Sequence, residues 1–286
     1  MRLFLAVAAA AALLATSPAL AAPPASTAQE VAGFAAPTAQ GRLEALKALL
    51  DNRGIPYELQ SFTSAKGPGV NVVVTLGKGD RDILLTAHYD AKVLKDGKLA
   101  DAVVDNAASV VALVHAAGEL KGGLKNHRLR IVFFDQEELG LLGAHAYAGG
   151  PDAGRAAAVI NFDINAYGDT PFFSVGEGEA QATILSAMAK ACKAVKQDCL
   201  GFEKYPPSDH LAFRKVGILA TSISILPRDE ALALDGFMAA PQAAAAPPRI
   251  LGLIHTPDDT MASVDPTTVE QAARLAVAAA KAFDAR

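Results

Sequence analysis

RIVFFDQEELGLLGAHAYA, residues 130–148, places two adjacent glutamates shortly after an apolar run. That run, which extends from 129 to 134, has the length and the β-branched and aromatic content of a buried strand. The side chains that follow it become polar and then small, in a helical pattern. The stretch therefore predicts a strand that leads toward a helix, with Glu137 and Glu138 where the strand ends.

Four further apolar runs have the character of strands, and helical patterns separate several of them. The additional strands are predicted at 70–76, 82–87, 157–162 and 218–225, and the helices at 41–53, 106–120, 182–196 and 267–285. Strands that alternate with helices are typical of an α/β fold, in which helices cover both faces of a largely parallel sheet. Residues 237–250 break this rhythm, and their Ala/Pro content predicts a long flexible loop.

The N-terminus has the features of a secretory signal. Arg2 precedes an apolar run from Leu3 to Ala15, and a small-residue stretch ends at Ala21. A membrane anchor is the alternative, but the apolar run is well short of the roughly 20 residues that span a bilayer. We therefore expect a secreted or periplasmic protein without a membrane span. The expected organisation is a signal peptide at 1–21, a flexible lead-in at 22–40 and a single domain at 41–286.

Charge and cysteine content narrow the function classes. The formal net charge of −4 gives no basic surplus with which to bind nucleic acid or a membrane surface. The two cysteines, Cys192 and Cys199, lie seven positions apart in a chain expected to be exported, so we predict a disulfide between them. A zinc site is the alternative, but the Cys/His spacing of such a site is missing around them.

Side chains that suit a metal follow several of the predicted strands. His88 follows the strand at 82–87, Asp163 follows the strand at 157–162, and His255 follows a short apolar run. Open α/β sheets bind their ligands at the carboxyl ends of the strands. The oxygen and nitrogen donors of histidine and carboxylate side chains suit zinc. The candidate zinc ligands are His88, Asp105, Glu138, Asp163 and His255.

The two adjacent glutamates then acquire separate roles. Consecutive side chains at a strand end point in different directions, so Glu138 can bind a metal while Glu137 reaches the water beside it. Each acid also has an ordinary interpretation: Asp105 as a helix N-cap, and both glutamates as acids that favour a helix dipole. The joint occurrence of all these residues favours the metal site.

Six motifs in order carry a family resemblance over residues 42–283. They are AHYDA (87–91), VDNAAS (104–109), FFDQEELGLLGAHAYA (133–148), NFDIN (161–165), PSDHLAF (207–213) and HTPDDT (255–260). With them the chain resembles the secreted bacterial two-zinc aminopeptidases, which are related to glutaminyl cyclases. The resemblance implies their α/β fold, a mixed, mostly parallel central sheet sandwiched by helices.

The resemblance also implies a site for two zinc ions that share one ligand. The ligands would be His88 and Asp163 for one ion, Glu138 and His255 for the other, and Asp105 for both. A cis peptide bond would follow the shared aspartate, between Asp105 and Asn106.

By the same resemblance, Glu137 would be the general base. Asp90 would orient the ring of His88, and Asp209 would lie at the substrate site. The activity implied is that of a monomeric aminopeptidase, which hydrolyses the N-terminal bond of peptides with a zinc-activated water. Where some relatives have an oxyanion-assisting tyrosine, this chain has Ile254, and Tyr167 or Tyr205 is an alternative.

Two other functions are open. The chain also resembles glutaminyl cyclases, single-zinc acyltransferases, at HYDAK (88–92) and HTPDD (255–259), although it contains no Trp with which to line their pocket. A non-catalytic binding module with the hydrolase fold is the third possibility, and the complete set of site residues argues against it.

We predict that the exported protein begins near Ala22, because the small-residue pattern that ends at Ala21 is a cleavage signal. N-terminal sequencing of the protein from a periplasmic or culture fraction checks this. Retention of Met1 in that fraction would contradict it.

Overall fold

The computed structural model describes residues 25–243 and 246–285, so the expected signal peptide lies outside the described residues. One sheet of eight strands, in the order β1-β2-β4-β3-β5-β8-β6-β7, runs through this part of the chain. The strands are β1 (Tyr57–Ser64), β2 (Gly67–Leu76), β3 (Asp82–His88), β4 (Arg128–Phe134), β5 (Ala156–Phe162), β6 (Thr170–Ser174), β7 (Leu200–Phe202) and β8 (Ala220–Leu226). Neighbours β4, β3, β5 and β8 are parallel, whereas β2 and β6 flank them antiparallel. The expected mixed, mostly parallel sheet is confirmed.

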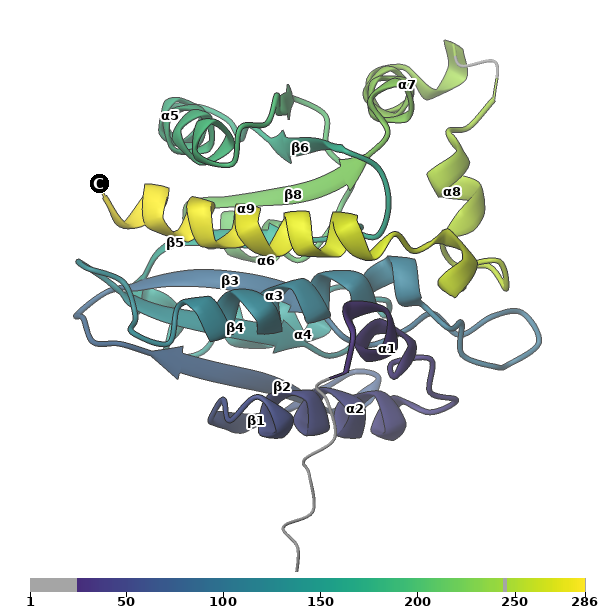
Figure 1. Ribbon diagram of the computed structural model, residues 1–286, viewed down its shortest axis with the longest axis horizontal. Coiled ribbons are helices and arrows are strands. Elements are labelled where there is room, and N and C mark those ends of the chain that lie inside the picture. The colour runs from purple at the N-terminus through teal and green to yellow at the C-terminus, as the bar shows by residue number, and fades with distance from the viewer. Residues whose placement is uncertain (1–24, 244–245, 286) are drawn as a thin grey trace, which may run out of the picture.

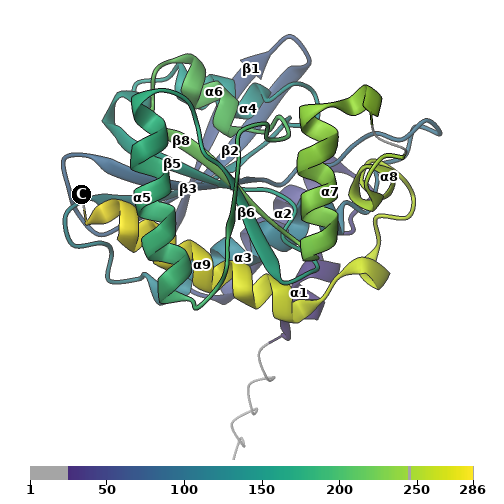
Figure 2. The ribbon, with the colours of Figure 1, turned by 90° about the horizontal axis from the view of Figure 1, so that it is seen from above.

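Helices cover both faces of this sheet (Figure 1). They are α1 (Thr27–Ala32), α2 (Ala39–Asn52), α3 (Ala108–Glu119), α4 (Leu142–Ala148), α5 (Glu179–Ala194), α6 (His210–Lys215), α7 (Arg228–Ala239), α8 (Arg249–Leu253) and α9 (Pro266–Asp284), with short turns η1 (Val103–Ala107), η2 (Ala153–Arg155), η3 (Pro241–Ala243) and η4 (Met261–Ser263). Figure 2 shows α3 and α9 on one face and α4 and α6 on the other. Among the described helices, none has the length and apolar character needed to cross a membrane.

Strand β4 shows why the sheet is covered on both sides. Its side chains Leu129, Ile131 and Phe133 enter the larger core, which α3 and α9 help to form. The alternate side chains, Val132 and Phe134, enter a second core with α4 and α6. Because successive side chains of a strand point to opposite faces, the continuous apolar run from Ile131 to Phe134 requires two covered faces.

Two stretches differ from the sequence-based expectation. Part of the expected lead-in at 22–40 is helical, since Ser26 and Gln29 form a capping box at α1, and Val31 and Phe34 are buried in the core. The flexible loop expected at 237–250 is wrong at both ends, because α7 continues to Ala239 and α8 begins at Arg249. The Ala/Pro composition hid these helices, and residues 244–245 lie outside the described ranges.

The predicted disulfide is present. Cys192 near the end of α5 is bonded to Cys199, just before β7, and their Cα atoms are 6.1 Å apart. Such a separation is within the usual range for a disulfide. The bond closes the turn between the helix and the short edge strand.

Replacing both Cys192 and Cys199 with Ser should lower the free energy of unfolding by about 2–3 kcal/mol, because the bond restricts the unfolded chain across a short loop. Chemical denaturation of the two proteins measures the difference. Reduction of the wild-type protein should reproduce the loss. A double variant as stable as the oxidised wild type would contradict the prediction.

Candidate metal centre

The parallel strands deliver the predicted ligands to one edge of the sheet. His88 ends β3, Asp163 follows β5, and Glu138 follows β4 by a few residues. Asp105 reaches the same place from the η1 turn, and His255 from the segment after α8. The structure therefore brings together all five residues that the sequence suggested as zinc ligands.

These donors form two groups that share one residue. In the first, Nε2 of His88 lies 3.1 Å from Oδ1 of Asp105 and 3.7 Å from Oδ1 of Asp163. In the second, Nε2 of His255 lies 3.0 Å from Oδ2 of Asp105 and 3.1 Å from Oε1 of Glu138. Asp105 thus presents one carboxylate oxygen to each group. The expected cis bond from Asp105 to Asn106 is also present.

The donor set fits a pair of cations. Oε1 of Glu138 and Oδ1 of Asp163 are buried, and neither makes a well-formed hydrogen bond among the described residues; each instead lies near a histidine Nε2, that of His255 at 3.1 Å and that of His88 at 3.7 Å. Buried polar atoms normally find a partner, because burial without one is costly. Imidazole nitrogens and carboxylate oxygens at these separations are the ligands that zinc prefers. The residues present therefore match a two-zinc centre.

The pKa values of the cluster also indicate a site that attracts positive charge. Burial would raise the pKa of Asp105, but hydrogen bonds from His255 and His88 hold it well below its ordinary value. The pKa of His255 is raised to about 10 by its hydrogen bonds to Asp105 and Glu138. Without metal, protons on the histidines supply the positive charge that the carboxylates require. A metal ion that binds here must displace those protons.

Glu137 lies beside the two groups without belonging to either. Burial raises its pKa well above the ordinary value; His88 opposes this shift, and the charges of Asp209 and Asp163 add to it. A carboxylate with a raised pKa is a stronger base, and such groups are frequent in active sites.

Asp90 connects three residues of the site. Its Oδ1 lies 3.3 Å from Nδ1 of His88, so it is placed to orient the imidazole ring. Its two oxygens also accept hydrogen bonds from the backbone N–H groups of Glu137 (3.0 Å) and Glu138 (3.1 Å). The sequence suggested the first contact and gave no sign of the second.

Asp209 is buried next to the cluster. It has no exposed surface, and neither carboxylate oxygen has a hydrogen-bond partner in the described part of the chain. Burial raises its pKa well above the ordinary value, with His88 opposing and Asp163 and Asp90 reinforcing the shift. With no exposed surface, its carboxylate is not available to contact a substrate, in contrast to the place at the substrate site that the resemblance implied.

Three residues at the site were missed by sequence reasoning. Nζ of Lys92 lies 3.4 Å from Oε2 of Glu138. Asp259 accepts backbone hydrogen bonds from the segment that carries Asp105, and Arg42 binds carbonyl groups of the same region. Lys92 and Asp259 belong to motifs recognised in the sequence, whereas nothing marks Arg42 beyond its place in a predicted helix.

The two tyrosines considered for the oxyanion already have partners. The hydroxyl of Tyr167 bonds to Glu230 at 2.9 Å. The hydroxyl of Tyr205 lies 2.5 Å from Oγ of Ser224, which in turn donates to the carbonyl of Asp163. Tyr205 therefore supports the strand end that carries a candidate ligand.

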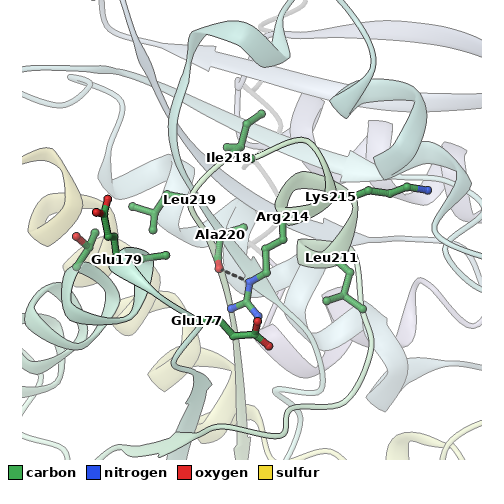
Figure 3. A pocket seen from close by; sticks show the side chains of 11 residues that line it. Glu177, Glu179, Leu211, Arg214, Lys215, Ile218, Leu219 and Ala220 are labelled. Carbon is green, nitrogen blue, oxygen red and sulfur yellow. Dashed lines mark hydrogen bonds between the residues drawn. The ribbon is translucent and has the colours of Figure 1, made fainter.

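A cavity of about 750 Å³ lies apart from this centre, near Ala220, the first residue of β8 (Figure 3). Glu177, Glu179, Arg214 and Lys215 line it together with apolar side chains, and Arg214 bonds to the carbonyl of Ala220. None of the candidate ligands lines it. This cavity is therefore separate from the candidate metal centre, which lies at the carboxyl ends of the parallel strands.

Comparison with known proteins agrees with this architecture. The chain is 24% identical, over 74% of its length, to a probable leucine aminopeptidase of Arthroderma otae, of which it spans 56%. Among solved structures, it is similar to glutaminyl cyclase from Porphyromonas gingivalis (TM-score 0.67, 20% identity, 88% of this chain and 94% of that one). It is equally similar to a Zn-dependent exopeptidase from Parabacteroides distasonis (TM-score 0.67, 18% identity, 89% and 95%).

The chain spans about half the length, or less, of the curated relatives it matches. The similarity to solved structures, at these identities, concerns the fold. The model of peptidase family M28 matches residues 71–280, a range that includes every candidate ligand. With the fold and the donor set in agreement, the chain belongs to peptidase family M28.

Proposed function

We propose that this protein is an exported, zinc-dependent aminopeptidase that removes the N-terminal residue of peptides. The observation that carries the proposal is the shared carboxylate: each oxygen of Asp105 belongs to a different group of candidate ligands, with the carboxylate of Glu137 beside them. This arrangement supports a centre for two zinc ions acting on one substrate.

In the proposed centre, His88 and Asp163 would hold one ion, Glu138 and His255 would hold the other, and Asp105 would contribute to both. Zinc, when bound, would act as a Lewis acid that makes water nucleophilic at neutral pH and stabilises negative charge on the oxygen of the substrate carbonyl. Asp90 keeps the imidazole of His88 in orientation through its contact with Nδ1.

Glu137 is the proposed general base. Its carboxylate takes the proton of the attacking water and passes it to the nitrogen of the leaving amine. Asp209 strengthens this base, because its buried charge contributes to the raised pKa of Glu137. The two residues thus act together without Asp209 touching the substrate.

The acidic surroundings explain a preference for a free N-terminus. The side chain of His255 is 44% exposed, whereas that of Glu138 is only 3% exposed, so the second ligand group opens to solvent on the His255 side. A substrate ammonium that enters here approaches the negative charge of the carboxylate cluster. We propose that this attraction places the first peptide bond at the centre, so that one residue is removed at a time.

Glutaminyl cyclase activity is the second candidate, and the likeness to a solved cyclase over most of both chains favours it. Two features support the aminopeptidase instead. The donors form two complete groups, whereas a cyclase of the kind that the sequence resembles uses one zinc, and the chain contains no Trp.

We predict that the protein releases the chromogenic amine from unblocked aminoacyl amides and does not cyclise peptides with N-terminal glutamine. A chelator should abolish the release and lower the melting temperature, because zinc stabilises only the folded state, and added zinc should restore both. Absorbance and thermal denaturation measure the two effects. Cyclisation without amide hydrolysis would favour the second candidate, and activity that survives complete metal removal would reject both.

Glu137→Gln should lower kcat by roughly 10² to 10⁴, the usual contribution of a positioned acid or base, and should leave the zinc content unchanged. Glu138→Gln should weaken or lose one zinc, because a neutral amide is a poorer ligand than a carboxylate. Steady-state kinetics and metal analysis of both variants separate the roles. If Glu137→Gln loses zinc while Glu138→Gln keeps it, the roles are reversed; changes of only a few fold in both would make the pair ordinary surface acids.

A further inference from the structure

The segment that carries Asp105 has little regular structure to hold it. Ala102 has a positive φ of 48°, and Asp105 (φ −122°, ψ 82°) departs from helical geometry inside η1. Backbone groups that leave a regular hydrogen-bond pattern in a buried place need other partners. The placement of the shared ligand therefore depends on the side chains that bind residues 101–105.

A buried carboxylate binds one part of this segment. Oδ1 of Asp259 accepts a hydrogen bond of 2.7 Å from the backbone N–H of Val104, and Oδ2 accepts one of 3.2 Å from that of Asp105. Asp259 is 1% exposed, so these bonds are shielded from water. It follows His255 by four positions, so the segment that supplies one ligand also anchors the backbone of another.

A buried guanidinium binds the other part. Nη1 of Arg42 donates to the carbonyl of Asp101 at 2.8 Å, and Nη2 donates to that of Ala102 at 3.2 Å. Its Nε also donates, at 2.6 Å, to the carbonyl of Tyr89, which follows His88. Arg42 is fully buried, and no carboxylate in the described ranges forms an ion pair with it. The N–H groups of Arg42 instead donate to backbone carbonyl groups.

We propose that Asp259 and Arg42 are positioning residues, which hold Asp105 where both metal ions can share it. The anion binds consecutive N–H groups and the cation binds consecutive C=O groups, so the pair holds the segment on both sides of Val103. Fixing the segment before metal arrives lowers the ordering cost that metal binding would otherwise include. This inference rests on the proposed metal centre and adds what keeps its bridging ligand in place.

Asp259→Asn tests the anchor directly, because it preserves size and replaces one acceptor oxygen with an N–H donor that faces a backbone N–H. Supporting groups of this kind typically contribute 10-fold to 100-fold to metal affinity. Titration calorimetry of the metal-free protein with zinc should show that loss for at least one of the two ions. Binding of both ions within threefold of the wild-type affinity would overturn the proposal.

Asp258→Asn is the matched control. Asp258 is the exposed neighbour of Asp259, and its substitution removes the same charge without touching residues 101–105. Its zinc affinity should equal that of the wild type. An equal loss in both variants would attribute the effect to net charge and would overturn the role of the hydrogen bonds.

Hydrogen exchange in the unaltered protein decides the matter should Asp259→Asn fail to fold. In the metal-free wild type, the N–H groups of Val104 and Asp105 should exchange slowly, since Asp259 already binds them. Rapid exchange that becomes slow only with zinc would show that metal orders the segment, and would overturn the proposal. Neither measurement uses catalysis: zinc binding without peptidase activity defeats only the proposed function, whereas a wild type that binds no zinc defeats both.

Discussion

The structure depends on gathering several carboxylates in a buried place, where their mutual repulsion must be compensated. Asp105 is the most constrained of them, because its two oxygens face His88 on one side and His255 on the other. The raised pKa values of both histidines show that the cluster attracts positive charge. Parallel strands make such a gathering feasible, since their carboxyl ends bring distant parts of the chain to one edge. The remaining architecture holds this edge rigid.

Two buried carboxylates, Asp90 and Asp259, hold the backbone around the candidate ligands in similar ways. Asp90, two positions after His88, accepts the backbone N–H groups of Glu137 and Glu138. Asp259, four positions after His255, accepts those of Val104 and Asp105. In each case an acid close in sequence to a histidine of the candidate centre binds the backbone of a distant candidate ligand. Histidine and carboxylate donors are thereby fixed relative to each other through the main chain.

The sequence predicted the parts of the fold with strong local signals. Five strands correspond to apolar runs, because β2, β3, β4, β5 and β8 are buried in the sheet. The edge and short strands β1, β6 and β7 were missed, since each is partly polar or only a few residues long. Among the candidate ligands, His88, Glu138 and Asp163 were found because imidazole and carboxylate groups after strands are conspicuous, whereas Asp105 and His255 lie after a turn and a helix and were found by their residue type and motifs. The roles of Arg42 and Asp259 were not, because they bind backbone groups whose proximity only the fold creates.

The edges of the sheet carry a consequence for association between copies of the chain. An open strand is a template for pairing with another chain, and proteins limit this hazard with short or polar edge strands. Here one edge is β7, which has only three residues, and the other is β1, whose exposed residues are mostly polar: Glu58, Leu59, Ser61 and Thr63. Neither offers a long apolar surface for strand addition. Copies of the folded chain are thus protected against joining through their sheets.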